Sequence, residues 1–184
     1  MGKLMRWLWV IGLFSIYHTG LAAMGGDFTL TDQQGKPFQL QQLRGKVVLL
    51  SFGYTYCPDI CPTELARISS VLNGLGGDAD QVQGLFITLD PGRDTPPVLQ
   101  AYLNYFNPSL IGLTGSDAAI SQVATAYHVA FQKQAQPDGD YSLDHSANLY
   151  LIDRNGQLFG MVPYGLPAAH VLQVVRSLLD GSTQ

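Results

Sequence analysis

The stretch that decides the fold is VVLLSFGYTYCPDICPTELARISSVL, residues 47–72. It opens with a continuous run of apolar and β-branched residues, which is typical of a central strand buried on both faces. Two cysteines, Cys57 and Cys61, follow in a short turn. From Pro62 onward apolar residues recur every three or four positions, which predicts an amphipathic helix that ends near the glycines at 74–77. The cysteine pair therefore lies between a buried strand and the start of a long helix.

Strand and helix patterns alternate on both sides of this unit. Apolar and polar residues alternate around a glycine-containing turn at the start of the chain, and an Asn-Gly pair at 155–156 marks a second hairpin near its end. The predicted elements, in chain order after the first hairpin over 28–40, are strand 47–52, helix 62–75, strand 85–89, helix 96–106, strand 110–113, helix 116–127 with Ser116 as its N-cap, hairpin 147–162 and helix 167–179.

This order of elements predicts an α/β domain over residues 27–180. Strands that alternate with helices form a sheet with helices on both faces, and the two hairpins add antiparallel strands. The order is that of a thioredoxin-like fold, in a peroxiredoxin-like variant with a central mixed sheet flanked by helices and an N-terminal β-hairpin. The longest irregular piece, 133–141, contains Pro137 and Gly139 and is predicted to be a mobile loop.

Composition excludes several classes of protein. The 184 residues suffice for one domain with a full hydrophobic core, and 46% of them are apolar while 13% are charged. These values argue against disorder and against a coiled coil. Two cysteines are too few for a disulfide-stapled mini-domain or a four-cysteine zinc site. Ten Lys and Arg against fourteen Asp and Glu give a net charge of −4 without a basic cluster, so a nucleic-acid partner is not expected.

The first 23 residues are predicted to be a signal peptide. Lys3 and Arg6 precede an apolar run over 8–17, and small residues follow at 20–23. The alternative is an uncleaved membrane anchor, because residues 7–26 contain no charged side chain and could just span a bilayer. Either segment places the domain in the bacterial periplasm, soluble or tethered to the inner membrane, and the anchor would be its sole membrane contact. Neighbouring cysteines in an oxidising compartment tend to form a disulfide.

The position of the cysteine pair favours chemistry over a purely structural role. A helix N-terminus carries partial positive charge and free N–H groups, which stabilise a thiolate. The i and i+4 spacing allows both sulfurs to lie on one side of a turn, where they can bond to each other or bind one ion. A disulfide that closes so short a loop would stabilise the fold by only about 2 kcal/mol. A stabilising disulfide is therefore the weaker interpretation.

Three histidines follow the N-terminal segment. His128 lies at a helix end, where a cation is favourable, and is interpreted as structural. His170 lies in the last helix and is expected at the surface. His145, in Asp144-His145-Ser146, comes just before a strong strand, in a loop that a thioredoxin-like fold brings beside the cysteine turn. From the residues alone, a structural role for His145 remains the default.

Three separated motifs occur together in one order: YCPDICP at 56–62, LDPGRDTP at 89–96 and DHS at 144–146. With GLTG at 112–115 and YLID at 150–153, they make the chain similar to the Sco/SenC family of copper-binding assembly proteins, from about Phe28 to the C-terminus. Members of that family bind one copper ion through two cysteines and a histidine. They help to build the dinuclear copper centre of cytochrome c oxidase, as metallochaperone, thiol reductant or both.

The resemblance implies copper, one ion per chain, with Cys57, Cys61 and His145 as ligands. Two thiolates and an imidazole suit Cu(I) and are tolerable for Cu(II). The implied partners are the copper-carrying subunit of the oxidase and an upstream periplasmic copper donor. Family members are commonly tethered through a linker, which this chain nearly lacks.

Residues around the implied ligands are assigned supporting roles. Asp144 could orient the neighbouring imidazole, as carboxylates outside the ligand shell do, or be a plain turn residue. Asp90 follows a strand at the same edge of the sheet and is expected to face the site. Arg93 and Asp94 are expected to brace the loop that contains them.

Three alternatives stay open. A thiol–disulfide oxidoreductase would use Cys57 and Cys61 as a redox pair, and could reduce the copper-ligand cysteines of the oxidase subunit. Against a thioredoxin-type enzyme, three residues separate the cysteines instead of two, and no proline precedes the strand at Ala147. A peroxidase of similar fold is disfavoured because a second cysteine occupies the turn. Zinc held by two cysteines, a histidine and water also fits the number of ligands.

Overall fold

The strand β3 (Val47–Gly53) is buried along its whole length and forms the centre of the fold. It pairs in parallel with β4 (Val82–Thr88) and antiparallel with β8 (Asn148–Ile152). The protein is described by a computed structural model that covers residues 24–137 and 139–181, so the predicted signal peptide or anchor over 1–23 lies outside the described residues. A strand buried on both faces explains the unbroken apolar run at 47–50.

Seven strands form one mixed sheet in the order β2-β1-β5-β4-β3-β8-β9. The three central parallel strands, β3, β4 and β5, lie between antiparallel neighbours on either side. This arrangement confirms the predicted mixed sheet and the N-terminal hairpin. The remaining strands of this sheet are β1 (Thr29–Asp32), β2 (Pro37–Gln39), β5 (Ile111–Thr114) and β9 (Leu158–Pro163).

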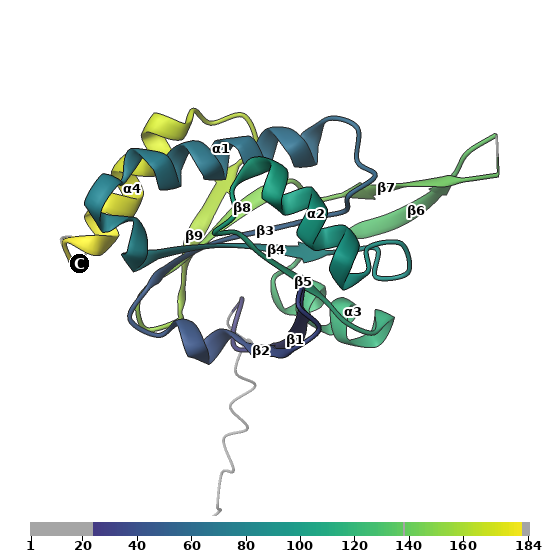
Figure 1. Ribbon diagram of the computed structural model, residues 1–184, viewed down its shortest axis with the longest axis horizontal. Coiled ribbons are helices and arrows are strands. Elements are labelled where there is room, and N and C mark those ends of the chain that lie inside the picture. The colour runs from purple at the N-terminus through teal and green to yellow at the C-terminus, as the bar shows by residue number, and fades with distance from the viewer. Residues whose placement is uncertain (1–23, 138, 182–184) are drawn as a thin grey trace, which may run out of the picture.

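Helices cover both faces of the sheet (Figure 1). Helices α1, α2 and α4 lie on one side and α3 lies on the other, which gives three layers. The helices are α1 (Ile60–Gly74), α2 (Pro96–Phe106), α3 (Asp117–Ala126) and α4 (Ala168–Leu179), with short 3-10 helices η1 (Leu40–Leu43) and η2 (Gly76–Gln81). None of the helices in the described part of the chain combines the length and apolarity needed to cross a bilayer.

The helix ends largely follow the sequence-based expectations. Ser116 caps α3, and its hydroxyl accepts the N–H of Ala119 at 3.2 Å. Helix α1 begins at Ile60, two residues earlier than expected, and Pro62 is tolerated in its first turn because N–H groups there have no partner within the helix. His128 ends α3 with a φ of 54°, and its N–H donates to the carbonyl of Thr125 at 3.1 Å. His128 therefore closes a helix through its backbone.

The irregular loop predicted over 133–141 is shorter in the structure, because residues 133–135 and 141 belong to strands. Strands β6 (Phe131–Ala135) and β7 (Tyr141–His145) form a separate antiparallel hairpin, which extends away from the body of the molecule in Figure 1. Most side chains of β6 are exposed, so the strand lacks the apolar alternation that a strand on a core would show. Pro137 and Gly139 do mark a turn, and Gly139 has a φ of +88°.

Candidate metal centre

The cysteine loop, which we define as residues 54–59, joins β3 to α1 and carries Cys57, while Cys61 lies in the first turn of α1. The N–H of Cys57 donates to the carbonyl of Tyr54 at 3.2 Å, which tightens the loop before the helix starts. The N–H of Cys61 donates to Sγ of Cys57 at 3.5 Å. Cys61 is buried, whereas Cys57 is half-buried. The first turn of α1 therefore holds one sulfur inside and one near the surface.

His145 is the last residue of β7, and the hairpin brings its imidazole to the cysteine pair. Its Nε2 lies 3.4 Å from Sγ of Cys61, although 84 positions separate the two residues in the chain. Its Nδ1 lies 3.0 Å from the carbonyl oxygen of Ser146. A proton on Nδ1 donated to that carbonyl leaves the lone pair of Nε2 directed at the sulfurs.

The three side chains meet the first geometric requirement of a metal site. The ligand atoms of Cys57, Cys61 and His145 all lie within 4.8 Å of one another. The expectation that His145 belongs to a loop before a strand is corrected, because a strand carries it. The ring of Tyr54 contacts the imidazole edge-on, with 6.1 Å between ring centroids, and so supports it from the side of the cysteine loop.

The two thiols are electrostatically different. The hydrogen bond from Cys61 lowers the pKa of Cys57 to about 3, helped by His145 and by the N–H groups of Cys61 and Asp59 against the effect of burial. The same hydrogen bond, followed by burial, raises the pKa of Cys61 above its ordinary value. These opposite shifts favour the thiolate at Cys57 and the protonated thiol at Cys61. Stabilisation of a thiolate by N–H groups at a helix start is the effect expected there.

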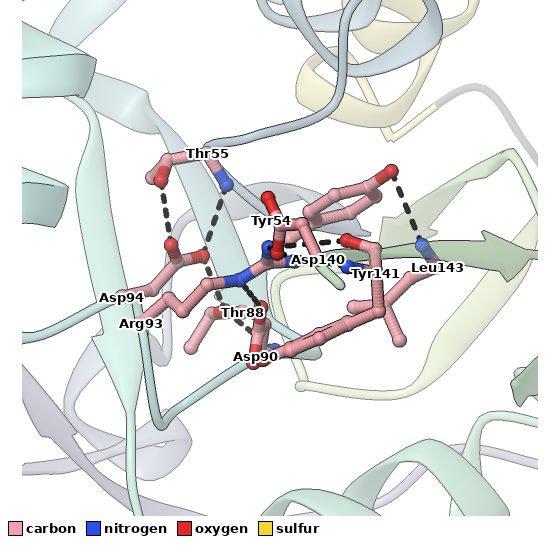
Figure 2. A network of polar contacts seen from close by, with 9 residues as sticks. All are labelled: Tyr54, Thr55, Thr88, Asp90, Arg93, Asp94, Asp140, Tyr141 and Leu143. Atoms are coloured by element: carbon pink, nitrogen blue, oxygen red, sulfur yellow. Dashed lines mark hydrogen bonds and ion pairs between the residues drawn. The ribbon is translucent and has the colours of Figure 1, made fainter. Parts of the chain in front are cut away.

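Asp94 ties the cysteine loop to the end of β4. Its buried carboxylate accepts the N–H and the hydroxyl of Thr55 at 3.0 and 2.6 Å, and the hydroxyl of Thr88 at 2.6 Å. Burial raises the pKa of Asp94, while the bonds from Thr55 and Thr88 act in the opposite direction. Figure 2 shows Asp94 between these two threonines. The bracing role expected of Asp94 is confirmed by these contacts.

Asp90 and Arg93 belong to a second network, on the side of the hairpin (Figure 2). Asp90 forms an ion pair with Arg93 and accepts the hydroxyl of Tyr141 at 2.7 Å. Asp90 is 1% exposed, so it lies inside this network. Asp90 was expected to face the metal ligands. In the structure its carboxylate instead holds Arg93 and Tyr141 of the hairpin.

Asp144 does not take the orienting role that the sequence left open for it. Its carboxylate accepts Nε2 of Gln134 at 2.9 Å on the exposed side of the hairpin. Neighbouring residues of a strand point to opposite faces, so Asp144 and His145 diverge. The carbonyl of Ser146 lies at Nδ1 of His145 instead. Backbone carbonyls leave no residue-type signature, so the sequence offered no signal for this contact.

Sequence reasoning also missed the part played by tyrosines. The hydroxyl of Tyr54 accepts the N–H of Leu143 at 3.2 Å, and the rings of Tyr54, Tyr56 and Tyr141 surround the guanidinium of Arg93. The alternation of Tyr141, Leu143 and His145 along β7 was a signal that these residues share one face. The remaining histidine, His170, is exposed on α4, as expected.

The fold and this site together define a thioredoxin-like domain with a soft, sulfur-rich metal site at its strand-to-helix turn. The family model described as SCO1/SenC matches residues 17–180. The chain belongs to the SCO1/SenC family.

Individual relatives agree with this assignment. The mitochondrial protein SCO2 of Saccharomyces cerevisiae is 47% identical over 141 residues, which are 75% of this chain and 47% of the yeast protein. A SCO2-like protein of Rickettsia felis is 43% identical over 148 residues, which are 79% of this chain and 72% of that protein. This chain thus spans about half the length of the yeast relative.

A solved structure resembles the fold closely. The structure of Bradyrhizobium japonicum ScoI with copper bound superimposes with a TM-score of 0.80 at 44% identity, covering 85% of this chain and 100% of that chain. Copper is bound to ScoI in that structure. In this chain, Cys57, Cys61 and His145 form a potential copper site.

Proposed function

We propose that this protein binds one copper ion through Cys57, Cys61 and His145 and helps to assemble the dinuclear copper centre of cytochrome c oxidase. The observation that carries the proposal is the convergence of three ligand atoms within 4.8 Å, from a helix start and from a strand that lies outside the main sheet. Membership of the SCO1/SenC family and the likeness to a copper-bound ScoI support it.

The donor set fits copper as cargo. Thiolates and imidazole are soft to borderline ligands that suit Cu(I) and accept Cu(II). Two thiolates and Cu(I) carry a net charge of −1, which the N-terminus of α1 stabilises. Cys57 is half-buried, so a thiolate or imidazole of an acceptor protein can approach the ion from its side while Cys61 holds it from inside.

A second function, reduction of a disulfide in the oxidase subunit, is favoured by the difference between the two thiols. The Cys57 thiolate would attack the acceptor disulfide, and one acceptor sulfur would leave as a thiolate. Cys61 would lose its proton and attack the mixed disulfide, which releases the second acceptor thiolate and leaves a Cys57–Cys61 disulfide. A dithiol reductant must then restore the pair. The low pKa of Cys57 and its partial exposure suit the attacking role.

We also propose where the protein acts and with what it exchanges copper. Residues 1–23 direct export to the bacterial periplasm as a signal peptide, or retain the domain at the inner membrane as an anchor. The copper-carrying subunit of the oxidase is the acceptor, and an upstream periplasmic protein is the donor. Export is supported by the sequence, in which Lys3 and Arg6 precede an apolar run over 8–17 and small residues follow at 20–23.

Copper titration of the reduced protein tests the metal site. We expect one copper ion per chain, and we expect Cys57→Ser to abolish both copper binding and disulfide formation. His145→Ala should weaken Cu(II) binding by at least about 100-fold with the fold intact. Loss of a residue that only hydrogen-bonds to a ligand already lowers metal affinity by about 10- to 100-fold, and His145 is a ligand itself. His170→Ala, which removes an exposed histidine on α4, is the control and should bind copper as wild type does.

The contrary outcomes are distinct. Retention of copper by Cys57→Ser, or unchanged Cu(II) affinity in His145→Ala, would show that the ligand set is wrong. If the protein purified under reducing conditions held one equivalent of zinc and retained no copper, the metal of this site would be zinc and not copper. Transfer to an isolated oxidase copper domain then separates the two functions: movement of copper supports the metallochaperone, and reduction of an oxidised domain without copper movement supports the reductase.

A further inference from the structure

We infer that Arg93 is a positioning residue for the metal centre, because it fastens the hairpin that carries His145 to the cysteine loop, which carries Cys57 and leads into the helix that carries Cys61. The inference rests on the proposed copper function. Arg93 lies in the loop of residues 90–94, hereafter the 90–94 loop, between β4 and α2. It is not a metal ligand, and it acts through His145.

The hairpin needs side-chain anchors because the main sheet does not hold it. Strands β6 and β7 pair with each other, and neither is hydrogen-bonded into the seven-stranded sheet. The backbone ladder that fixes the other strands is therefore missing for the strand that ends at His145. The distance between the imidazole and the sulfurs depends on contacts that join β7 to the 90–94 loop and to the cysteine loop.

Arg93 makes several of these contacts at once (Figure 2). Its Nη1 donates to Oδ1 of Asp140 at 2.9 Å and to the carbonyl of Tyr141 at 3.1 Å. Its guanidinium carbon lies 3.7 Å from the centroid of the Tyr141 ring. Asp90 completes the arrangement, since its carboxylate binds both Nε of Arg93 and the hydroxyl of Tyr141. One end of β7 is thus fixed to the 90–94 loop.

The same guanidinium also faces the cysteine loop. Its carbon lies 4.7 Å from the ring centroid of Tyr56, which directly precedes Cys57, and 5.9 Å from that of Tyr54. Asp94, next to Arg93 in the chain, holds Thr55 of the cysteine loop by two hydrogen bonds. The 90–94 loop therefore grips β7 with one side chain and the cysteine loop with the next.

The link from Arg93 to His145 runs along one face of β7. Tyr141, Leu143 and His145 alternate with outward residues, so a displacement of Tyr141 is passed along the same strand to the imidazole. Tyr54 contacts this strand at two points, through its hydroxyl to the N–H of Leu143 and through its ring to the imidazole. These contacts define the route by which Arg93 acts.

Position 93 requires an arginine, and a lysine could not make the same set of contacts. A planar guanidinium can stack on rings and donate in its plane at the same time, which a lysine ammonium cannot do. Nη2 of Arg93 is buried without a hydrogen-bond acceptor. The cation is thus held among the aromatic rings even though one of its donors stays unsatisfied.

The test compares Arg93→Gln with wild type in two measurements. In the reduced, copper-free protein, nuclear Overhauser contacts between the His145 and Tyr54 rings should weaken or disappear. In the Cu(II)-loaded protein, the affinity should fall by about 10- to 100-fold, and the spectrum should shift toward that of His145→Ala. A double-mutant cycle gives the decisive comparison: in the His145→Ala background, Arg93→Gln should cause no further loss of Cu(II) affinity.

Arg67→Gln is the matched control. Arg67 also pairs with a carboxylate three residues earlier, Glu64, and also donates to backbone carbonyls, those of Pro163 and Leu166. It should lower stability and leave Cu(II) affinity and the His145–Tyr54 contacts unchanged. A similar loss of affinity in Arg67→Gln would reduce the effect of Arg93 to general destabilisation and overturn the inference.

Two further outcomes also overturn it: wild-type affinity and ring contacts in Arg93→Gln, or an equal loss of affinity with and without His145. Failure of the proposed function looks different, because wild type itself would then bind no copper. The ring contacts in the copper-free protein decide the positioning role in that case, and their persistence in Arg93→Gln counts against it.

Discussion

Gly53 shows how a single residue permits the approach of helix and strand at the metal centre. It ends β3 directly before the cysteine loop. A Cβ atom added there would lie 2.6 Å from Sγ of Cys61 and 2.9 Å from a ring carbon of Phe86. Both distances are shorter than any normal contact, so the sulfur can occupy its place only beside a glycine.

We expect Gly53→Ala to displace the Cys61 sulfur and to destabilise the protein. Overpacking of a filled core costs about 1–3 kcal/mol. Chemical denaturation measures the loss of stability, and copper titration measures the effect on the site. Gly77→Ala is the control, because nothing lies within 4 Å of a Cβ added at Gly77. Equal stability of Gly53→Ala and Gly77→Ala would mean that the close approach at Gly53 imposes no constraint.

At the scale of elements, Leu143 is the buried apolar residue of the hairpin β6–β7, and Phe131 of β6 packs against the core beside it. Leu143 is buried in the middle of β7, while most residues around it are exposed or half-buried. Burial of a leucine side chain stabilises by about 1.5–3 kcal/mol. The hairpin is therefore attached by the buried Leu143 and the partly buried Phe131, by the N–H of Leu143 on Tyr54 and by the contacts of Arg93.

Leu143→Ala should loosen the hairpin more than it unfolds the protein. We expect a loss of about 2–5 kcal/mol if the hairpin stays docked in every folded molecule, and a smaller global loss if it opens locally. Amide hydrogen exchange distinguishes global destabilisation from local opening of the hairpin. Local opening raises the exchange rates of amides in β6 and β7 and leaves those in β3 and β4 unchanged. Gln132→Ala, which truncates an exposed side chain of β6, is the control. Unchanged exchange in β6 and β7 would contradict the role given to Leu143.

The same hairpin marks the limit of prediction from sequence. Elements that pack on the core could be predicted, because burial gives their apolar residues a recognisable spacing along the sequence. The strand at 47–50, the helix after Pro62 and the Asn-Gly turn at 155–156 were all placed correctly within a few residues. Strand β6 carries polar side chains on both faces, and no period survives there. A strand that does not pack on a core leaves no apolar signal.

At the scale of the whole molecule, some residues of the candidate site could be predicted from the sequence and others could not. Local spacing pointed to Cys57 and Cys61, since both lie in one turn of the chain. His145 could be assigned through the family resemblance alone, because 84 residues separate it from Cys61 and only the finished fold brings them together. The contacts of Arg93 with Tyr141 span 48 residues and involve residue types that are ordinary at a surface. Such long-range partners are fixed by topology, which a single sequence does not display.

The free energy of unfolding of the whole molecule should depend on pH through one buried carboxyl group, that of Glu64. Glu64 is buried on α1, and burial raises its pKa, against the opposing effect of its ion pair with Arg67. A carboxyl with a higher pKa in the folded state binds its proton more tightly there than in the unfolded chain. The folded protein then holds more protons, and the free energy of unfolding contributed by this group falls as pH rises.

The fall begins near the ordinary glutamate pKa of about 4.3 and ends above the raised pKa of the folded state. Glu64→Gln removes the titration and keeps the shape, so the stability of wild type relative to Glu64→Gln should decline across this window and be constant above it. Denaturant unfolding of both proteins at a series of pH values measures this difference, in which the other carboxyls cancel. A difference that instead grows with pH would mean that the attraction of Arg67 outweighs burial, and that this ion pair stabilises the start of the cysteine-bearing helix.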